Sequence, residues 1–172
     1  MIKMFVTYPL QFTGFVLFQV LILNNVQLGG TVNPYVYILF ILWLPIEWNK
    51  ALVMGIAFVL GLSIDVFSDT MGMHASACVF LAFARPYVLN LFAPRDGYEL
   101  NAPPTAGGLG WFWFLRYAVT GVFLHHSFLF FVEVFRFSEF FDTLGRILAS
   151  SVFSLVLIFL AQVFSSNVEE RR

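Results

Sequence analysis

Apolar runs follow one another along almost the whole chain, from Leu10 to Phe164, and only short polar stretches separate most of them. Of the 172 residues, 60% are hydrophobic and 11% are charged, about half the charged fraction of a typical soluble domain. No polar half is left that would form a separate water-soluble domain. The sequence therefore predicts an all-α, polytopic (multi-pass) membrane protein whose residues 1–172 form a single transmembrane domain.

Cutting these runs at clusters of charge, glycine and proline predicts about six transmembrane helices. The second and third runs are short for a crossing of about 20 residues, so a re-entrant pair or a tilted helix is an alternative interpretation of this part. One long polar connection follows the fourth run. The expected spans are 4–23, 35–46, 51–67, 71–92, 111–135 and 143–164, and the long cytoplasmic loop is 93–110.

Positive charge is distributed unevenly between the two predicted sides of the membrane. With the N-terminus inside, seven lysine and arginine residues are cytoplasmic and two, Arg136 and Arg146, are outside. This imbalance fits the positive-inside rule with both termini cytoplasmic. Arg85, next to the helix-kinking Pro86, is expected to extend its side chain toward the cytoplasmic interface.

The overall charge and the cysteine content exclude some classes of protein. The net charge of −1 leaves no basic surface with which to bind nucleic acid. The single cysteine, Cys78, cannot form an intrachain disulfide. The first run ends in NNVQLGG rather than in a small-residue cleavage site, so it is expected to be a retained span and not a signal peptide.

An acid, Asp65, lies at the end of the third run, four residues before Asp69. A carboxylate in apolar surroundings is costly, and the C-terminal end of a helix disfavours an anion. Asp65 is therefore expected to face a donor: the N-terminal amides of the next helix, His74, or a basic group. It is either a buried polar clamp for the turn or a partner-binding position. Asp69, in Ser-Asp-Thr before an apolar run, fits a helix N-cap.

Glycines surround this acid. Gly55 and Gly61 lie in the third run and Gly72 lies at the following turn, and residues without side chains allow membrane helices to approach closely. The hypothesis that follows is a partner-binding or hinge region. Its candidate residues are Gly55, Gly61, Asp65, Asp69, Gly72 and His74.

A second polar cluster lies within the fifth run. His125 and His126 are followed by Glu133, which shares a helix face with His126 at a spacing of seven residues. Metal sites need three or four ligands, so buried interhelical hydrogen bonding is favoured over metal binding. Glu133 is expected to pair with Arg136 or Arg146. No catalytic set can be identified from spacing, so neither a cofactor nor an enzymatic activity is expected.

The turn around the acid resembles the MreD family of bacterial rod-shape-determining proteins. The resemblance rests on an apolar span that ends in a Gly-Leu-x-x-Asp pattern, followed by a short turn and then by glycine and a small residue. The resemblance extends more loosely to the chain length, the number of spans and the basic tail. The chain departs from the family in two places: it has Met71 where many members have leucine before the turn glycine, and the loop after the fourth span is longer. The matching residues are Gly61, Leu62, Asp65, Gly72 and Ala75.

This resemblance implies a non-enzymatic component of the cell-elongation (rod) complex in the bacterial inner membrane, which helps organise peptidoglycan synthesis and cell shape. Its partners would be an MreC-type single-span protein and, through it, a cell-wall glycosyltransferase and a penicillin-binding transpeptidase, all surrounded by membrane lipid. The family is also similar in fold to the substrate-binding subunits of energy-coupling-factor transporters. The alternative function is therefore a vitamin-type small-molecule-binding subunit with a pocket near the outer face. A third class is a membrane-embedded enzyme that uses His125, His126 and Glu133.

Overall fold

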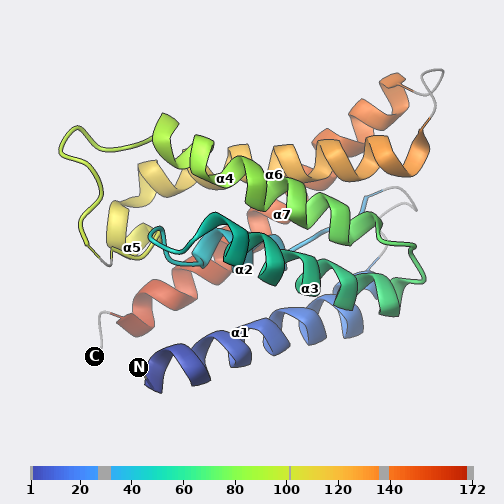
Figure 1. The fold of residues 1–172 in the computed structure, drawn as a ribbon. Helices are drawn as coiled ribbons and strands as arrows, with labels where there is room; N and C mark the ends of the chain where they lie inside the picture. The colour runs from blue at the N-terminus through green and yellow to red at the C-terminus, as the bar shows by residue number, and fades with distance from the viewer. Residues whose placement is uncertain (1, 27–31, 101, 136–139, 170–172) are drawn as a thin grey trace.

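The computed structural model describes residues 2–26, 32–100, 102–135 and 140–169, and these residues form a helical bundle. Helix α1 begins and helix α7 ends at the same end of the bundle, and the polar loop between α4 and α5 lies at that end too (Figure 1). The elements are α1 (Ile2–Leu21), the 3-10 helix η1 (Leu23–Asn25), α2 (Ile38–Trp43), α3 (Lys50–Ser68), α4 (Met73–Leu91), α5 (Ala106–Leu109), α6 (Trp111–Val134) and α7 (Phe140–Glu169).

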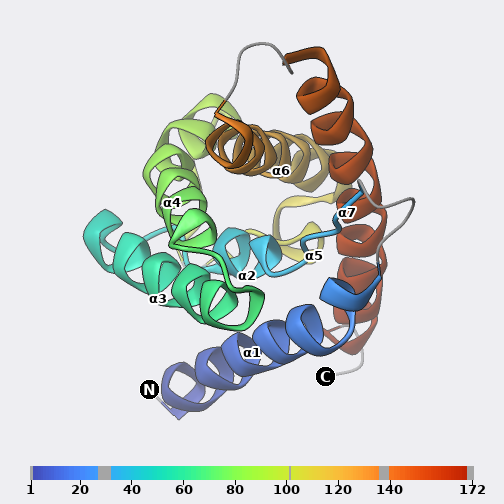
Figure 2. The ribbon, with the colours of Figure 1, turned by 90° about the vertical axis from the view of Figure 1, so that its right-hand side faces the viewer.

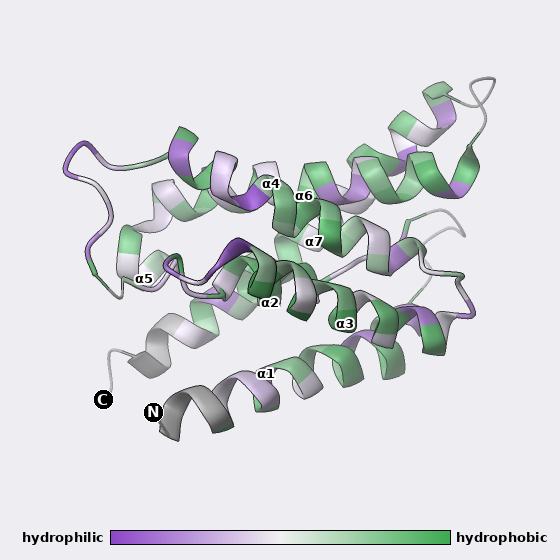
Figure 3. Cartoon of the chain, in the orientation of Figure 1, coloured by the Kyte–Doolittle hydropathy of each residue, from purple (hydrophilic) through white to green (hydrophobic). Residues whose placement is uncertain are grey.

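Four of these helices are long and apolar enough to span a membrane, so the chain has the character of a polytopic membrane protein. Figure 3 shows hydrophobic residues along the helices and hydrophilic residues gathered in the loop between α4 and α5. The termini and this loop share one end, as the predicted topology requires, whereas the cytoplasmic identity of that end stays a prediction. The four candidate spans are Val6–Asn25, Lys50–Ser68, Trp111–Val134 and Phe140–Ser165.

The expected second span, 35–46, contains a helix of only six residues, α2. Six helical residues extend about 9 Å, much less than a hydrocarbon core of about 30 Å. Helix α4 has 19 residues but contains His74 and Arg85 and does not belong to the four apolar spans. The number of six full crossings therefore remains a prediction, and four is the number that length and composition support.

Helix α2 is the centre of the bundle. Viewed along the bundle, it lies inside a ring formed by α1, α3, α4, α6 and α7 (Figure 2). Its residues from Ile38 to Leu42 are each at most 2% exposed. A helix that is apolar on every side lies in a protein core or in lipid, and the sequence ILFILW has this composition. Gly121 of α6 makes room for it, since a Cβ there would lie 2.9 Å from Leu42 Cδ2.

The chain that leads into α2 is not helical, and side chains from other helices bind its peptide groups. Gln19 of α1 donates from Nε2 to Pro34 O at 2.9 Å and accepts at Oε1 from Val36 N at 3.0 Å. Gln19 is 1% exposed, so both bonds lie inside the protein. A buried peptide group without a partner costs about 1–3 kcal/mol. Gln19 removes that cost for one acceptor and one donor of this segment.

Two serines of α7 bind the same non-helical segment. Ser150 Oγ accepts from Asn33 N at 3.1 Å, and Ser154 Oγ accepts from Tyr35 N at 2.9 Å. Both serines are fully buried. Non-helical backbone at membrane depth is tolerated only where protein surrounds it and supplies hydrogen bonds. The polar residues within the apolar runs of α1 and α7 meet that requirement.

Arg85 binds the other end of α2. Its Nη1 donates to Pro45 O at 3.4 Å, its Nη2 donates to Leu44 O, and its Nε donates to Tyr117 Oη at 2.8 Å. Tyr117 in turn donates to Leu42 O at 3.3 Å. Arg85 is 3% exposed, so the prediction that it extends to the cytoplasmic interface is wrong. The carbonyls at the C-terminal end of α2 have no intrahelical donor, and the guanidinium supplies one.

The two glycines of α3 have different environments. A Cβ on Gly61 would lie 2.4 Å from Ala75 Cα, so α3 and α4 touch through their backbones there. A Cβ on Gly55 would meet nothing within 4 Å, and Gly55 is exposed. Among the described residues, close helix approach is therefore found at Gly61, whereas Gly55 leaves open space beside α3.

This difference gives a matched test. Gly61→Ala is expected to lower the free energy of unfolding by about 1–3 kcal/mol, because the new methyl group overlaps the Ala75 backbone and the helices must separate. Gly55→Ala is expected to be neutral or slightly stabilising, because its methyl group enters open space. Thermal unfolding of the two purified variants in the same detergent measures the difference. Equal unfolding temperatures would contradict the α3–α4 contact.

Candidate functional site

The Asp65 carboxylate binds the first backbone amides of α4, the helix that follows it. Its Oδ1 accepts from His74 N at 3.0 Å and from Thr70 Oγ1 at 2.5 Å, and its Oδ2 accepts from Ala75 N at 2.9 Å. The side chain is 3% exposed. Of the donors expected for this acid, the N-terminal amides of the next helix are the ones observed. The positive end of α4 thus compensates for a charge placed in the last turn of α3.

Asp69 has a different position from the one predicted. It is the C-cap of α3 in a left-handed conformation, with φ of 54°, and it is exposed. The N-cap of α4 is Gly72, which has φ of 82° and makes no side-chain hydrogen bond. The prediction of an Asp69 N-cap is wrong because the turn continues for three more residues, and Asp65 reaches across it. Gly72 is suited to this place because a left-handed conformation costs glycine little.

His74 continues from this cap into the core. Its Nδ1 lies 2.8 Å from Tyr37 Oη, and the same hydroxyl lies 3.1 Å from His125 Nε2. A hydroxyl has a single proton to donate, so it donates to one imidazole and accepts from the other. Cys78 Sγ lies 4.0 Å from His125 Nε2, and His125 Nδ1 has no hydrogen-bond partner among the described residues. The three rings form one buried hydrogen-bonded row across α4, the chain before α2, and α6.

His126 faces a different helix. Its Nδ1 lies 2.9 Å from Val122 O, which can only accept, so Nδ1 carries the proton. Its Nε2, 3.2 Å from Ser154 Oγ, therefore accepts from that hydroxyl. Ser154 donates to His126 and accepts from Tyr35 N, so one side chain joins α6, α7 and the non-helical segment. Interhelical hydrogen bonding, the role favoured by the sequence, is what the structure shows for His126.

Glu133 pairs with one of its two expected partners. Its Oε1 lies 3.0 Å from Arg146 Nη1, between α6 and α7, while Arg136 lies outside the described residues. The Arg146 guanidinium also lies over the Phe130 ring, 4.4 Å from its centroid. His126 and Glu133 share a helix but bind different groups. Within the described part of the chain, no group of three or more His, Cys, Asp and Glu residues is placed to hold a metal ion.

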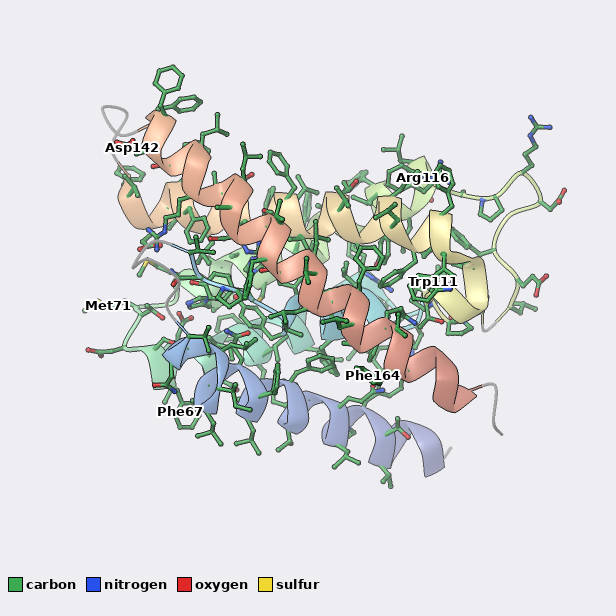
Figure 4. The ribbon with its side chains drawn as sticks, turned by 180° about the vertical axis from the view of Figure 1, so that it is seen from behind. Phe67, Met71, Trp111, Arg116, Asp142 and Phe164 are labelled. Atoms are coloured by element: carbon green, nitrogen blue, oxygen red, sulfur yellow. The ribbon has the colours of Figure 1, made fainter. Side chains whose placement is uncertain are left out.

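A cavity of about 360 Å³ lies where these groups meet. It is found at the end of the bundle opposite the termini, beside the α3–α4 turn; Phe67, Met71 and Asp142 mark this end in Figure 4, and Trp111, Arg116 and Phe164 mark the other half. Polar and apolar side chains both line it. The polar residues are Asn24, Asn33, Ser68, Thr70, His74, Glu133 and Arg146, and the others are Leu23, Pro34, Tyr35, Phe67, Met73 and Leu129.

Several residues of this site were not identified from the sequence. Tyr37 connects two histidines, and Asn24 joins two elements by donating from Nδ2 to Ser68 Oγ at 3.0 Å while accepting from Gln19 at 3.0 Å. Gln19 and Ser154 could have been predicted to make buried hydrogen bonds, because each is a polar residue inside an apolar run. Their partners in the non-helical segment, Pro34 and Tyr35, lie 15 and 119 positions away in the chain, so no local pattern reveals them.

No protein-family model, curated protein or solved structure matches this chain. The fold and the site therefore define its class: a helical, polytopic membrane protein whose core contains a hydrogen-bonded polar network and whose one end holds a polar-lined cavity.

The Asp65 cap can be tested with isosteric substitutions. Asp65→Asn removes one acceptor oxygen and leaves a buried amide of α4 opposite an NH₂ group, so unfolding is expected to become easier by about 1–3 kcal/mol. Asp69→Asn is the matched control, because asparagine tolerates the left-handed conformation and the side chain is exposed. Chemical unfolding of both variants in detergent measures the difference. A destabilisation of equal size in the two variants would refute the cap.

Proposed function

We propose that this protein is a non-enzymatic membrane subunit of a bacterial cell-elongation complex, similar to MreD, which resides in the inner membrane and binds an MreC-type single-span protein. Through that partner it would help organise the glycosyltransferase and the transpeptidase that build the cell wall. The observation that carries the proposal is the Gly-Leu-x-x-Asp turn pattern that the chain shares with this family. The helical, membrane-spanning character of the chain is compatible with it.

The structure gives three residues of this pattern specific tasks within one hairpin. Gly61 allows α4 to touch α3, Asp65 caps α4, and Gly72 makes the left-handed turn between them. Ala75 is the small residue that meets Gly61, and its amide donates to Asp65. The pattern therefore describes a rigid α3–α4 unit. This supports a structural role for Asp65 as a hinge clamp, rather than a role as a site that receives a partner.

The partner helix needs another surface, because Gly61 and Asp65 are both occupied within the protein. Gly55 faces a groove of about 640 Å³ between α1 and α3, whose floor is formed by Phe40 and Leu44. Its walls are mainly aromatic and aliphatic. We assign this groove to the partner's single transmembrane helix. The lining residues are Tyr8, Pro9, Phe12, Thr13, Phe40, Leu44, Trp48, Ala51, Leu52, Gly55, Ile56 and Val59.

Two physical arguments support a helix as the occupant. Helices associate in lipid through close packing, and a glycine without neighbours within 4 Å lets a second backbone approach. The groove also offers few polar groups, as suits a partner segment whose own backbone bonds are satisfied within its helix. The α1 span is only 17% buried in this chain alone, so it has surface available for a partner.

Gly55→Leu is expected to reduce recovery of a co-expressed, tagged MreC-type partner by about ten-fold, because the new side chain fills the groove. Gly145→Leu is the matched control, since Gly145 of α7 is also exposed and has no neighbour within 4 Å of a Cβ. Co-purification at equal expression measures the effect. Equal recovery with both variants would refute this docking surface.

The cellular role has its own test in the bacterium that encodes the chain. Depletion is expected to turn rod-shaped cells into rounded ones. Re-expression of Gly145→Leu is expected to restore rods, while Gly55→Leu is expected to fail. Cells that stay rod-shaped after depletion would refute the proposed function itself, whereas restoration by both variants would refute only the groove.

A further inference from the structure

The cavity beside the α3–α4 turn is independent of the groove that is assigned to a partner helix. The two share no lining residue and lie in different parts of the bundle. Its volume of about 360 Å³ falls at the lower end of the range for small-molecule sites, roughly 300–1,000 Å³. Side chains from η1, α3, α4, α6 and α7 converge on it, together with the non-helical segment before α2. These features are typical of a binding site for one small molecule.

The charged groups at this cavity are one acid and one base side by side. Glu133 and Arg146 are in contact at 3.0 Å, and their side chains are 35% and 22% exposed. The pair is nearly neutral, so a ligand with a net charge would gain attraction from one member and repulsion from the other. A molecule that carries both an ammonium and an acidic group would instead be attracted at both of its ends.

The guanidinium retains donors for such a ligand. Arg146 donates to Glu133 from Nη1, and its Nε is buried without a hydrogen-bond partner among the described residues. The buried Nε is not open to the cavity, so an anionic group would bond to the guanidinium through its terminal Nη groups, in a charge-assisted hydrogen bond. Arg146 is held in place by the Phe130 ring beneath it.

The remaining walls complete a site for a zwitterion. Asn24 retains one N–H after donating to Ser68, and the Thr70 hydroxyl, whose proton goes to Asp65, retains its acceptor lone pairs. The side chains of Asn33 and Ser68 also line the cavity. Apolar side chains provide space for the uncharged part of a ligand. These are Leu23, Phe67, Met73 and Leu129.

We propose that this cavity binds a small zwitterion, whose acidic group bonds to Arg146 and whose ammonium bonds to Glu133. The same chemistry exists in a free amino acid and in the headgroup of phosphatidylethanolamine. The site opens at the end of the bundle opposite the termini. It does not require the partner-binding function, and it remains a site even if the groove between α1 and α3 binds nothing.

The first experiment uses the purified full-length chain in nanodiscs of phosphatidylglycerol alone. The twenty common L-amino acids are added one at a time, and unfolding is followed by tryptophan fluorescence. A bound probe raises the unfolding temperature with its concentration. We expect at least one amino acid to do so, and Glu133→Gln and Arg146→Gln are each expected to weaken it by about ten-fold or more. Arg116→Gln, an exposed position on α6, is the control.

The second experiment tests the lipid source. The chain is purified from nanodiscs of equal phosphatidylethanolamine and phosphatidylglycerol, and retained lipid is measured by native mass spectrometry. If the unsubstituted protein and Arg116→Gln retain phosphatidylethanolamine, whereas Glu133→Gln and Arg146→Gln do not, the lipid headgroup is the ligand. Glu133→Gln is nearly isosteric and keeps a hydrogen-bond acceptor for Arg146, so it separates binding from folding.

Two results would overturn the proposal. One is that no amino acid shifts the unfolding temperature and no phosphatidylethanolamine is retained. The other is that binding persists undiminished in both Glu133→Gln and Arg146→Gln. Neither result affects co-purification of the partner, so the failure of this proposal can be distinguished from the failure of the proposed cell-elongation role.

Discussion

The structure depends on how one stretch of non-helical chain is held inside an apolar bundle. The residues before α2 enter the core without helical hydrogen bonds, and lipid cannot bind their peptide groups. Gln19, Ser150 and Ser154 supply those bonds at the start of α2, and Arg85 supplies them at its end. Each of these side chains is fully or almost fully buried. They make a six-residue helix, α2, into the centre around which five longer helices pack.

The side chains that bind this non-helical segment also determine the shape of the cavity at one end of the bundle. Tyr35 is held by Ser154, and Asn24 is held by Gln19, so the residues that bind the non-helical segment also shape the cavity beside it. On the other side of that cavity, Asp65 fixes the start of α4 and thereby the position of His74. Exposed apolar side chains remain on the outward faces of all five long helices, α1, α3, α4, α6 and α7. A buried polar network and an open lateral groove are the features on which the proposed partner-binding role depends.

The sequence predicted the helical class and the need of its costly acid for a donor, but not the contacts between distant segments. The amides of the next helix were one of three donors expected for Asp65, because the start of a helix favours an anion. Asp69 was misassigned because the length of a turn cannot be determined from a capping pattern. Arg85 was misassigned because its acceptors, among them Leu44 O, lie about 40 positions away in the chain, and no local pattern shows that they meet it. Tyr37 gave no signal, since an aromatic residue is ordinary in an apolar run.

Hydrogen–deuterium exchange in nanodiscs tests this account most directly. The amides of Tyr35 and Val36 lie outside any helix, yet each donates to a buried side chain. They are expected to exchange as slowly as the core of α4 and far more slowly than the loop 94–100, and Gln19→Leu is expected to release Val36. Exchange of this segment at the rate of the loop would contradict a backbone held in the core by Gln19 and Ser154.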